Sequence, residues 1–323
     1  MSLTLTNYWW LLIWLFVGGA ICSYFPKRRE LVNDRVVTRW DIWPAILMVL
    51  PYIVWAGFRP DFADTFLYRR GFLNATGGFG QAINVLFGEG KDTGYYAFVV
   101  IMRTILGDRD ELYLLIIAAI QMLCMTYVFR RYSSDFWMCI FLFIASTDYL
   151  SWMFNGIRQF IAVTIIFAGF PLMVSKQYVK MCLLILFASL FHGSALLMLP
   201  IVFVVQGEAW NAKTVLMLIA TMVIVVFVDS FTPILNELLQ DTQYDDMMTN
   251  EIWAVDDGTN IFRVLVYSAP ALLSLVGLRY IRAAGNPIMN VCVNCSIVTM
   301  ALYMISAVTS GIYIGRLPIY TTL

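Results

Sequence analysis

The stretch Asn155-Gly156-Ile157-Arg158-Gln159 opens the long apolar run Phe160–Val174, and the two together decide how the chain is interpreted. A run of this length and composition predicts a membrane helix. On a helix Asn155, Arg158 and Gln159 share one face, because residues three and four positions apart are neighbours. An arginine near the middle of a bilayer costs about 2.5–3.5 kcal/mol, and less toward the interface. We therefore expect this face to bind an anionic headgroup; the alternative is an arginine that merely reaches the interface from a helix end.

The composition predicts a membrane protein with many spans. Of the 323 residues, 61% are hydrophobic and 13% are charged, whereas soluble domains carry about 25% charged residues. Because the formal net charge is zero, a nucleic-acid partner is excluded. The six cysteines lie in apolar runs, which argues against a disulfide framework. The first apolar run, Tyr8–Phe25, lacks a basic leader and a cleavage site, and we expect it to be a retained span.

Loop charges predict the topology. The basic residues between Lys27 and Arg39 place the first loop in the cytoplasm and the N-terminus outside. The apolar run over residues 94–106 contains Arg103 and covers only about 20 Å of a core of about 30 Å, so we interpret it as a re-entrant or interfacial helix. If it does not cross, the later basic loops also fall inside. The predicted spans are then about Tyr8–Phe25, Trp43–Phe58, 112–129, 136–151, 155–174, 179–191, 194–206, 214–231, 261–281 and 288–310.

The expected fold is therefore an all-α polytopic membrane protein with about ten transmembrane helices and one short re-entrant or interfacial helix. Residues 1–323 form a single integral membrane domain in this interpretation, with extracytoplasmic loops at about 59–111 and 232–260. The second loop is acidic and either is simply solvated or covers a site. The region 179–206 is two helices, or one if the chain does not break at His192-Gly193-Ser194. The early end at Leu323 suggests a natural chain that continues.

This topology collects unusual polar residues at the outer ends of the spans. They are Arg59, Asp64 and Tyr68 after the second span, Asn155, Arg158 and Gln159 at the fifth, His192 at an outer turn, Asn260 and Arg263 at the start of the ninth, and Arg316 after the last. Arginine offers a planar fork of donors that binds phosphate oxygens in pairs. The site is therefore suited to a lipid-linked diphosphate. The only histidine of the sequence, His192, adds a group that exchanges protons near neutral pH.

Several short motifs resemble one known family. In chain order they are Arg59 with Asp64-Thr65 and Tyr68, Gly94-Tyr95-Tyr96-Ala97-Phe98, Asn155-Gly156-Ile157-Arg158-Gln159, Leu190-Phe191-His192-Gly193-Ser194-Ala195, Asn260 to Arg263, and Arg316-Leu317-Pro318-Ile319-Tyr320. They resemble the EpsG family of bacterial exopolysaccharide proteins, which are functional relatives of Wzy-type O-antigen polymerases. The chain departs from the family pattern at Asp92-Thr93-Gly94, where an acidic residue and a proline would be expected before the glycine.

The resemblance implies a metal-independent polysaccharide polymerase, a glycosyltransferase with no cofactor, in the bacterial cytoplasmic (inner) membrane, with its site facing the periplasm or exterior. Its donor and acceptor would be oligosaccharide repeats on undecaprenyl diphosphate, with other polysaccharide export proteins as further partners. Arg158, Arg263 and Arg316 would bind the diphosphates. His192 would be the general base, with Asp64 as the alternative base, oriented by Arg59.

Three other functions remain open from the sequence. A membrane O-acyltransferase that modifies a glycan would pair His192 with Asn155. A transporter or flippase of lipid-linked sugars usually shows two related halves, which this sequence lacks. A non-catalytic membrane scaffold would tolerate the loss of Arg158.

Overall fold

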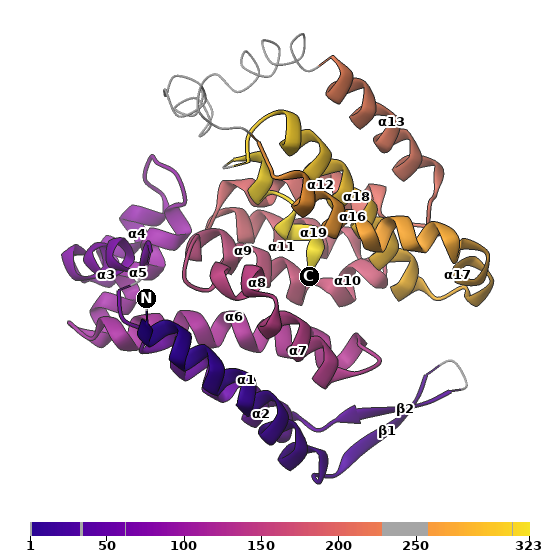
Figure 1. The fold of residues 1–323 in the computed structure, drawn as a ribbon. Coiled ribbons are helices and arrows are strands. Elements are labelled where there is room, and N and C mark those ends of the chain that lie inside the picture. Colours follow the sequence, from indigo (N-terminus) through magenta and orange to yellow (C-terminus); the bar gives the residue numbers. More distant parts are fainter. Residues whose placement is uncertain (1, 33–34, 62, 228–257, 312) are drawn as a thin grey trace. The chain divides into compact units, whose positions relative to one another are not determined.

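The computed structural model describes residues 2–32, 35–61, 63–227, 258–311 and 313–323. These residues are mostly helical, with seventeen α-helices among them. The chain divides into two compact units, which are described separately (Figure 1). Unit 1 is Met1–Phe170 with Phe187–His192, and unit 2 is Pro171–Leu186 with Gly193–Leu323.

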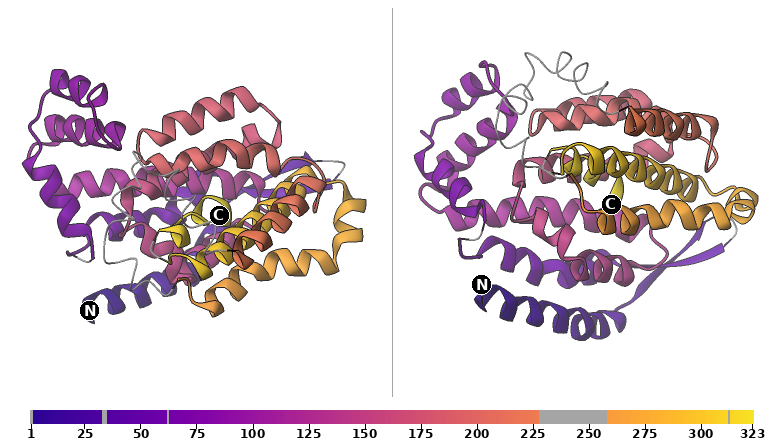
Figure 2. Two further views of the ribbon diagram at one scale, coloured as in Figure 1. Left: turned by 90° about the horizontal axis from the view of Figure 1, so that it is seen from above. Right: turned by 45° about the horizontal axis from the view of Figure 1, so that its top comes forward.

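Unit 1 begins with two helices joined by a hairpin. Helix α1 (Ser2–Ser23) leads into strands β1 (Lys27–Val32) and β2 (Arg35–Trp40), and α2 (Ile42–Gly57) returns beside α1 (Figure 2). The strands pair antiparallel. The all-α prediction missed this hairpin. Its basic residues were interpreted only as loop charges, and its strands are only six residues long.

Helix α6 is the centre of unit 1. It spans Asp110–Tyr132 and packs against α2 on one face and α9 (Ile157–Ala168) on another. Between α6 and α9 the chain forms α7 (Phe136–Ala145) and α8 (Thr147–Trp152). The buried face of α6 carries large apolar residues at helical spacing, including Tyr113, Ile117 and Met125, which is why it holds its neighbours together.

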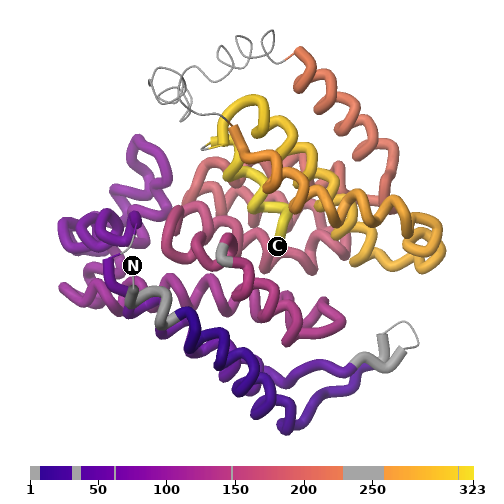
Figure 3. The backbone as a smooth tube through the Cα atoms, viewed as in Figure 1, coloured from indigo at the N-terminus to yellow at the C-terminus, as the bar shows by residue number. Residues whose placement is uncertain are grey.

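The expected outer segment 59–111 is largely helical. It contains α3 (Thr65–Asn74), α4 (Phe79–Leu86) and α5 (Thr93–Leu106), and Figure 3 traces the chain through them into α6. The short helix predicted over 94–106 is thus confirmed as a helix. Its N-terminal turn is fixed to α6 because the Tyr95 and Tyr113 hydroxyls hydrogen-bond over 2.6 Å. The Phe72 ring of α3 stacks on Tyr113 at 4.5 Å.

Unit 2 is built around α18 (Pro287–Val308), which packs against α13 (Ala212–Val226), α16 (Ile261–Val276) and α19 (Ile319–Thr322). The remaining helices that lie wholly or largely in it are α10 (Phe170–Val174), α11 (Tyr178–Ser189), η1 (Gly193–Leu197), α12 (Met198–Val204), α17 (Leu278–Ala284) and η3 (Ile314–Arg316). Most of the acidic loop predicted over 232–260 lies outside the described residues.

Within the described residues, α6 and α18 are long and apolar enough to cross a membrane. A third span results if α16 and α17, which are bent by 73° at their junction, are counted together. The other apolar helices are shorter; twelve residues, as in α9, reach only about 18 Å. Ten crossings are therefore not confirmed. The predicted spans 136–151 and 155–174 are each divided into two helices, and 179–206 is broken after Ser189.

Candidate functional site

Three residues with left-handed backbone begin the segments that carry the candidate site in unit 1. Ala63 (φ 49°) precedes Asp64, Asp92 (φ 55°) begins α5, and Gly156 (φ 68°) begins α9 two residues before Arg158. At Ala63 and Asp92 this conformation is uncommon and costs about 1–3 kcal/mol, whereas Gly156 adopts it without that penalty. It fixes the direction in which each segment starts.

A cleft of about 290 Å³ lies among the helices that these segments begin. Helix α3 supplies most of one wall, α5 another, and α9 contributes a single cation. The lining residues are Asp64, Leu67, Tyr68, Gly71, Phe72, Tyr95, Tyr96, Val99 and Arg158. The cleft therefore combines aromatic walls with one guanidinium and one carboxylate.

Arg158 is held by a carboxylate and by aromatic rings. Its Nη1 donates to Oδ2 of Asp92 over 2.7 Å and lies 3.4 Å from the Tyr96 hydroxyl. Its Cζ lies 5.9 Å from the ring centroids of both Tyr95 and Tyr96. The Arg158 side chain is 34% exposed and the Asp92 side chain only 6%. The carboxylate is thus enclosed behind the cation, and the cation faces the cleft.

Asn155 and Tyr68 lie where the segment that leads into α3 meets the start of α9. Oδ1 of Asn155 accepts a hydrogen bond from the backbone nitrogen of Asp64 over 3.2 Å. Burial raises the pKa of the Tyr68 hydroxyl, and the nearby Arg158 cation lowers it by less. Tyr68 is therefore a neutral donor at physiological pH. The structure brings Asp64, Tyr68, Asn155 and Arg158 together, as the sequence predicted.

The segment that carries His192 docks on the start of α5. The carbonyl oxygen of Leu190 accepts hydrogen bonds from Gly94 and Tyr95 at 2.9 and 3.2 Å. A Cβ on Gly94 would lie 2.6 Å from the Leu190 Cβ, so only glycine permits this approach. Half-buried His192 follows Leu190 by two residues, and Asp92 precedes Gly94 by two. The only histidine is therefore on a segment fixed next to the helix start that carries the partner of Arg158.

Arg59 is not in the cleft. It is 4% exposed, its Nε donates to the Thr65 hydroxyl over 2.9 Å, and its Nη1 donates to the Ala56 carbonyl over 2.5 Å. Its Cζ lies 5.0 Å from the Phe154 ring centroid. Burial, with the Arg69 cation as the second cause, lowers its pKa to about 10. In this structure Arg59 ties the end of α2 to the start of α3, and its predicted contact with substrate stays a prediction.

Gln159 is buried beside Arg158 and does not line the cleft. The other predicted residues, Asn260, Arg263 and Arg316, belong to unit 2. Asn260 caps α16, because its Oδ1 accepts from the Phe262 nitrogen over 2.8 Å. Arg263 lies over two rings, with its Cζ 5.7 Å from the Tyr267 centroid and 5.9 Å from that of Tyr303. Arg316 is exposed in η3. Their roles stay predictions.

Sequence reasoning missed Asp92 as the partner of Arg158. It noted Asp92 as a departure from a family pattern and did not pair it with Arg158. The available signal was position: Asp92 stands one turn before Tyr95-Tyr96, at a helix start, where a carboxylate is favourable. Among the described residues no group of three or more His, Cys, Asp and Glu side chains is placed to hold a metal ion.

The fold and the site define an integral membrane protein in which an arginine and a carboxylate meet at the start of a short helix. The family model of the EpsG family matches residues 42–323, and the chain belongs to this family. Membership suggests a function of the polysaccharide-polymerase kind. No curated protein and no solved structure matches the chain.

Proposed function

We propose that the protein is a polysaccharide polymerase that joins oligosaccharide repeats carried on undecaprenyl diphosphate at the outer face of the bacterial cytoplasmic membrane. The observation that carries this proposal is the guanidinium of Arg158, which faces an aromatic cleft and is backed by the enclosed carboxylate of Asp92. A guanidinium binds diphosphate oxygens through parallel hydrogen bonds. The carboxylate behind it fixes its orientation before substrate arrives.

The reaction is a substitution at the anomeric carbon of the donor glycan. A hydroxyl oxygen of the acceptor repeat forms the new bond to this carbon, and the bond from the carbon to the lipid diphosphate breaks. The diphosphate leaves with the bonding electron pair, so negative charge grows on its oxygen. Arg158 stabilises that charge, which is the type of contribution that preorganised donors make.

The hydroxyl proton goes to a base as the new bond forms. His192 is our first candidate, because its segment docks at the start of α5 beside Asp92. Asp64 is the second, because it lines the cleft itself. Tyr68 contributes a neutral hydroxyl that can donate to a phosphate or sugar oxygen.

The rest of the proposal follows the family and the loop charges. The chain would act as a single integral membrane domain, with residues 59–111 and 232–260 outside and the site facing the exterior. Arg263 and Arg316 are proposed as ligands of a lipid diphosphate, supported by their residue type and their places near helix ends. Positive charge from arginines makes a metal unnecessary for binding diphosphate.

Replacing Arg158 by lysine tests this proposal, because lysine keeps the charge but loses the planar fork. Arg158→Lys is expressed at matched membrane level in a strain lacking the gene, and the glycan ladder is measured. We expect the ladder to collapse to single lipid-linked repeats accessible to an external lectin. Arg28→Lys is the matched control, since Arg28 is exposed in the hairpin and pairs with Asp41 at 3.1 Å. An unchanged ladder for Arg158→Lys would refute the proposal.

A further inference from the structure

A second and larger cavity of unit 1, of about 810 Å³, lies among α3, α4 and α5. Organic ligands occupy sites of about 300–1,000 Å³. The cleft around Arg158, at about 290 Å³, is large enough for a diphosphate group but is much smaller than this neighbour. The proposed reaction leaves the larger cavity without a role.

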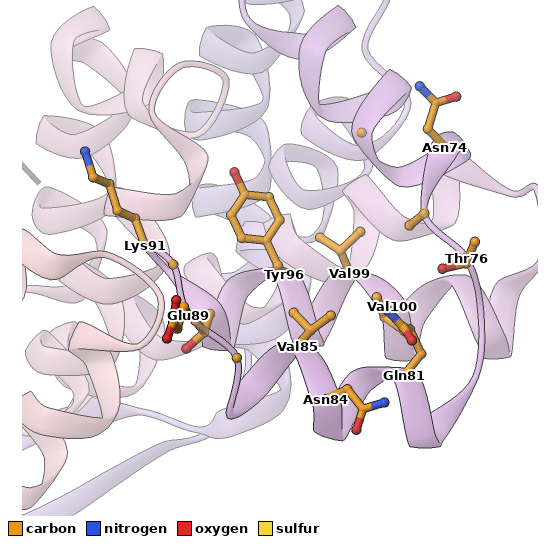
Figure 4. Close-up of a pocket in the computed structure, with 15 residues that line it drawn as sticks. Asn74, Thr76, Gln81, Asn84, Val85, Glu89, Lys91, Tyr96, Val99 and Val100 are labelled. Carbon is orange, nitrogen blue, oxygen red and sulfur yellow. The ribbon is translucent and has the colours of Figure 1, made fainter. Parts of the chain in front are cut away.

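The lining of this cavity combines apolar groups with several amides and carries little charge. Figure 4 shows Asn74 and Gln81 toward one end, Glu89 and Lys91 at the other, and Tyr96 between them. Asn84 adds a third amide. An amide side chain both donates and accepts hydrogen bonds, as a sugar hydroxyl does. Glu89 and Lys91 are the only charged residues of the lining, and their formal charges are opposite. The cavity as a whole therefore attracts neither anions nor cations strongly.

The cavity and the Arg158 cleft adjoin each other. Gly71, Tyr96 and Val99 line both of them. The hydroxyl of Tyr96 lies 3.4 Å from Nη1 of Arg158, and its half-exposed ring continues along the wall of the larger cavity. A molecule with an anionic group at Arg158 can therefore extend past the Tyr96 ring, which offers an apolar face to the C–H side of a sugar.

Helix α4 separates this cavity from an apolar surface. Its residues Phe79 and Ile83, with Phe87 just after the helix, are exposed and follow each other at intervals of four, so they share one face. Gln81 and Asn84 point to the other side and line the cavity. A helix with one apolar and one amide face is suited to the membrane interface. A sugar bound there would stay beside the lipid that carries it.

We propose that the cavity among α3, α4 and α5 binds the oligosaccharide repeat of a lipid-linked substrate whose diphosphate lies at Arg158. The ligand class is a short, essentially neutral oligosaccharide, recognised through its hydroxyls by Gln81 and Asn84 and through its ring face by Tyr96. This inference rests on the proposed function and assigns it a substrate subsite.

Gly71 provides the sharpest test, because a Cβ built on it meets nothing within 4 Å and so points into open space at the junction of the two cavities. Gly71→Leu should fill the junction without harming α3, since leucine favours helix far more than glycine does. The matched control is Gly80→Leu, a helical glycine of α4 whose Cβ also meets nothing within 4 Å but which lines neither cavity.

A second pair of variants removes hydrogen-bonding groups from the cavity, whereas Gly71→Leu fills its junction with the cleft. Gln81→Leu and Asn84→Leu change exposed amides and should leave the fold intact. Gln177→Leu, an exposed amide of unit 2, is their control. The loss of one hydrogen bond lowers affinity about twofold to tenfold.

Two readouts keep the subsite and the reaction separate. The first is elongation by the purified full-length protein of lipid-linked repeats extracted from a strain lacking the gene. The second is binding of the same repeat oligosaccharide after mild acid has released it from the lipid. We expect Gly71→Leu to weaken binding and to raise the KM for the repeat more than tenfold, and each amide variant to do so twofold to tenfold, with both controls like wild type.

The outcomes separate the two proposals. If wild type elongates repeats but Gly71→Leu and the amide variants bind and elongate as well as wild type, the subsite is wrong and the polymerase proposal stands. If wild type binds the oligosaccharide and the variants do not, but no elongation occurs, the subsite stands and the polymerase proposal fails. If wild type does not bind the released oligosaccharide at all, the subsite is overturned.

Discussion

Arg158 and Asp92 are sixty-six positions apart in the sequence, yet Nη1 of the arginine donates to Oδ2 of the aspartate over 2.7 Å. The pair joins the start of α9 to the start of α5. Because the aspartate is enclosed and the arginine faces the cleft, we propose different roles for them: Asp92 positions Arg158, and Arg158 contacts the substrate.

The pairing predicts strong coupling between substitutions at the two positions. Asp92→Asn should lower elongation about fivefold to thirtyfold, because a charge-assisted hydrogen bond of a partly exposed arginine contributes about 1–2 kcal/mol. In Arg158→Gln the aspartate has nothing left to orient, so Asp92→Asn should add little to it. The measurement is the elongation rate of the two single variants and the double variant. Independent, multiplying losses would show that Asp92 does not act through Arg158.

The two candidate bases can be ranked by substitution. We expect His192→Ala to lower the turnover number about 10²–10⁴-fold with little change in KM, which is the usual contribution of a general base. Asp64→Asn should mainly raise KM, because Asp64 lines the cleft where substrate binds. Turnover of His192→Ala close to that of wild type, together with a large loss in Asp64→Asn, would reverse the assignment.

The contact at Gly94 predicts a stability effect. In Gly94→Ala the new Cβ would lie 2.6 Å from the Leu190 Cβ and 3.0 Å from its carbonyl oxygen. We expect a loss of about 1–3 kcal/mol, because overpacking forces a backbone shift. Gly80→Ala, with open space around its Cβ, should be neutral or stabilising by about 0.5–1 kcal/mol. Thermal unfolding in detergent compares the two variants. Equal melting temperatures would show that residues 190–192 shift to accommodate the new Cβ without loss of stability.

Tyr68 predicts a pH dependence of stability. Its pKa is raised above the ordinary 10.0, chiefly by burial. A raised pKa means that the folded state holds the proton more tightly than the unfolded chain does, so the contribution to stability is complete below pH 10 and is lost as pH rises through the folded value. Wild type should therefore lose stability relative to Tyr68→Phe above about pH 10. Parallel unfolding curves of the two proteins from pH 8 to 11 would contradict this.

Length and residue type were sufficient for several parts of the structure. The run over 94–106 was too short to cross and contained Arg103, and it forms the short helix α5. The polar face at Asn155 and Arg158 does meet the loop residue Asp64. The first prediction depended on the length and composition of one short stretch. The second depended on the free-energy cost of placing a cation in lipid.

What could not be predicted depends on contacts between distant segments. The role of Asp92 could be recognised only from its hydrogen bond to Arg158. Arg59 was expected to contact the substrate, but its guanidinium is enclosed between α2 and α3. The larger cavity arises because α3, α4 and α5 assemble around it, and neither spacing nor composition describes that assembly. The 73° bend between α16 and α17, at Gly277, lies within the predicted span 261–281, and the apolar pattern does not indicate it.

The left-handed backbone of Asp92 has a consequence for how this protein can be evolved in the laboratory. Glycine would adopt the same φ of 55° without penalty, but it would leave Arg158 without its carboxylate. A random library screened only for heat resistance should therefore accumulate glycine at position 92, whereas one screened for secreted glycan should retain aspartate. Enrichment of glycine in the first screen and of aspartate in the second would show that thermal stability and glycan secretion favour different residues at position 92.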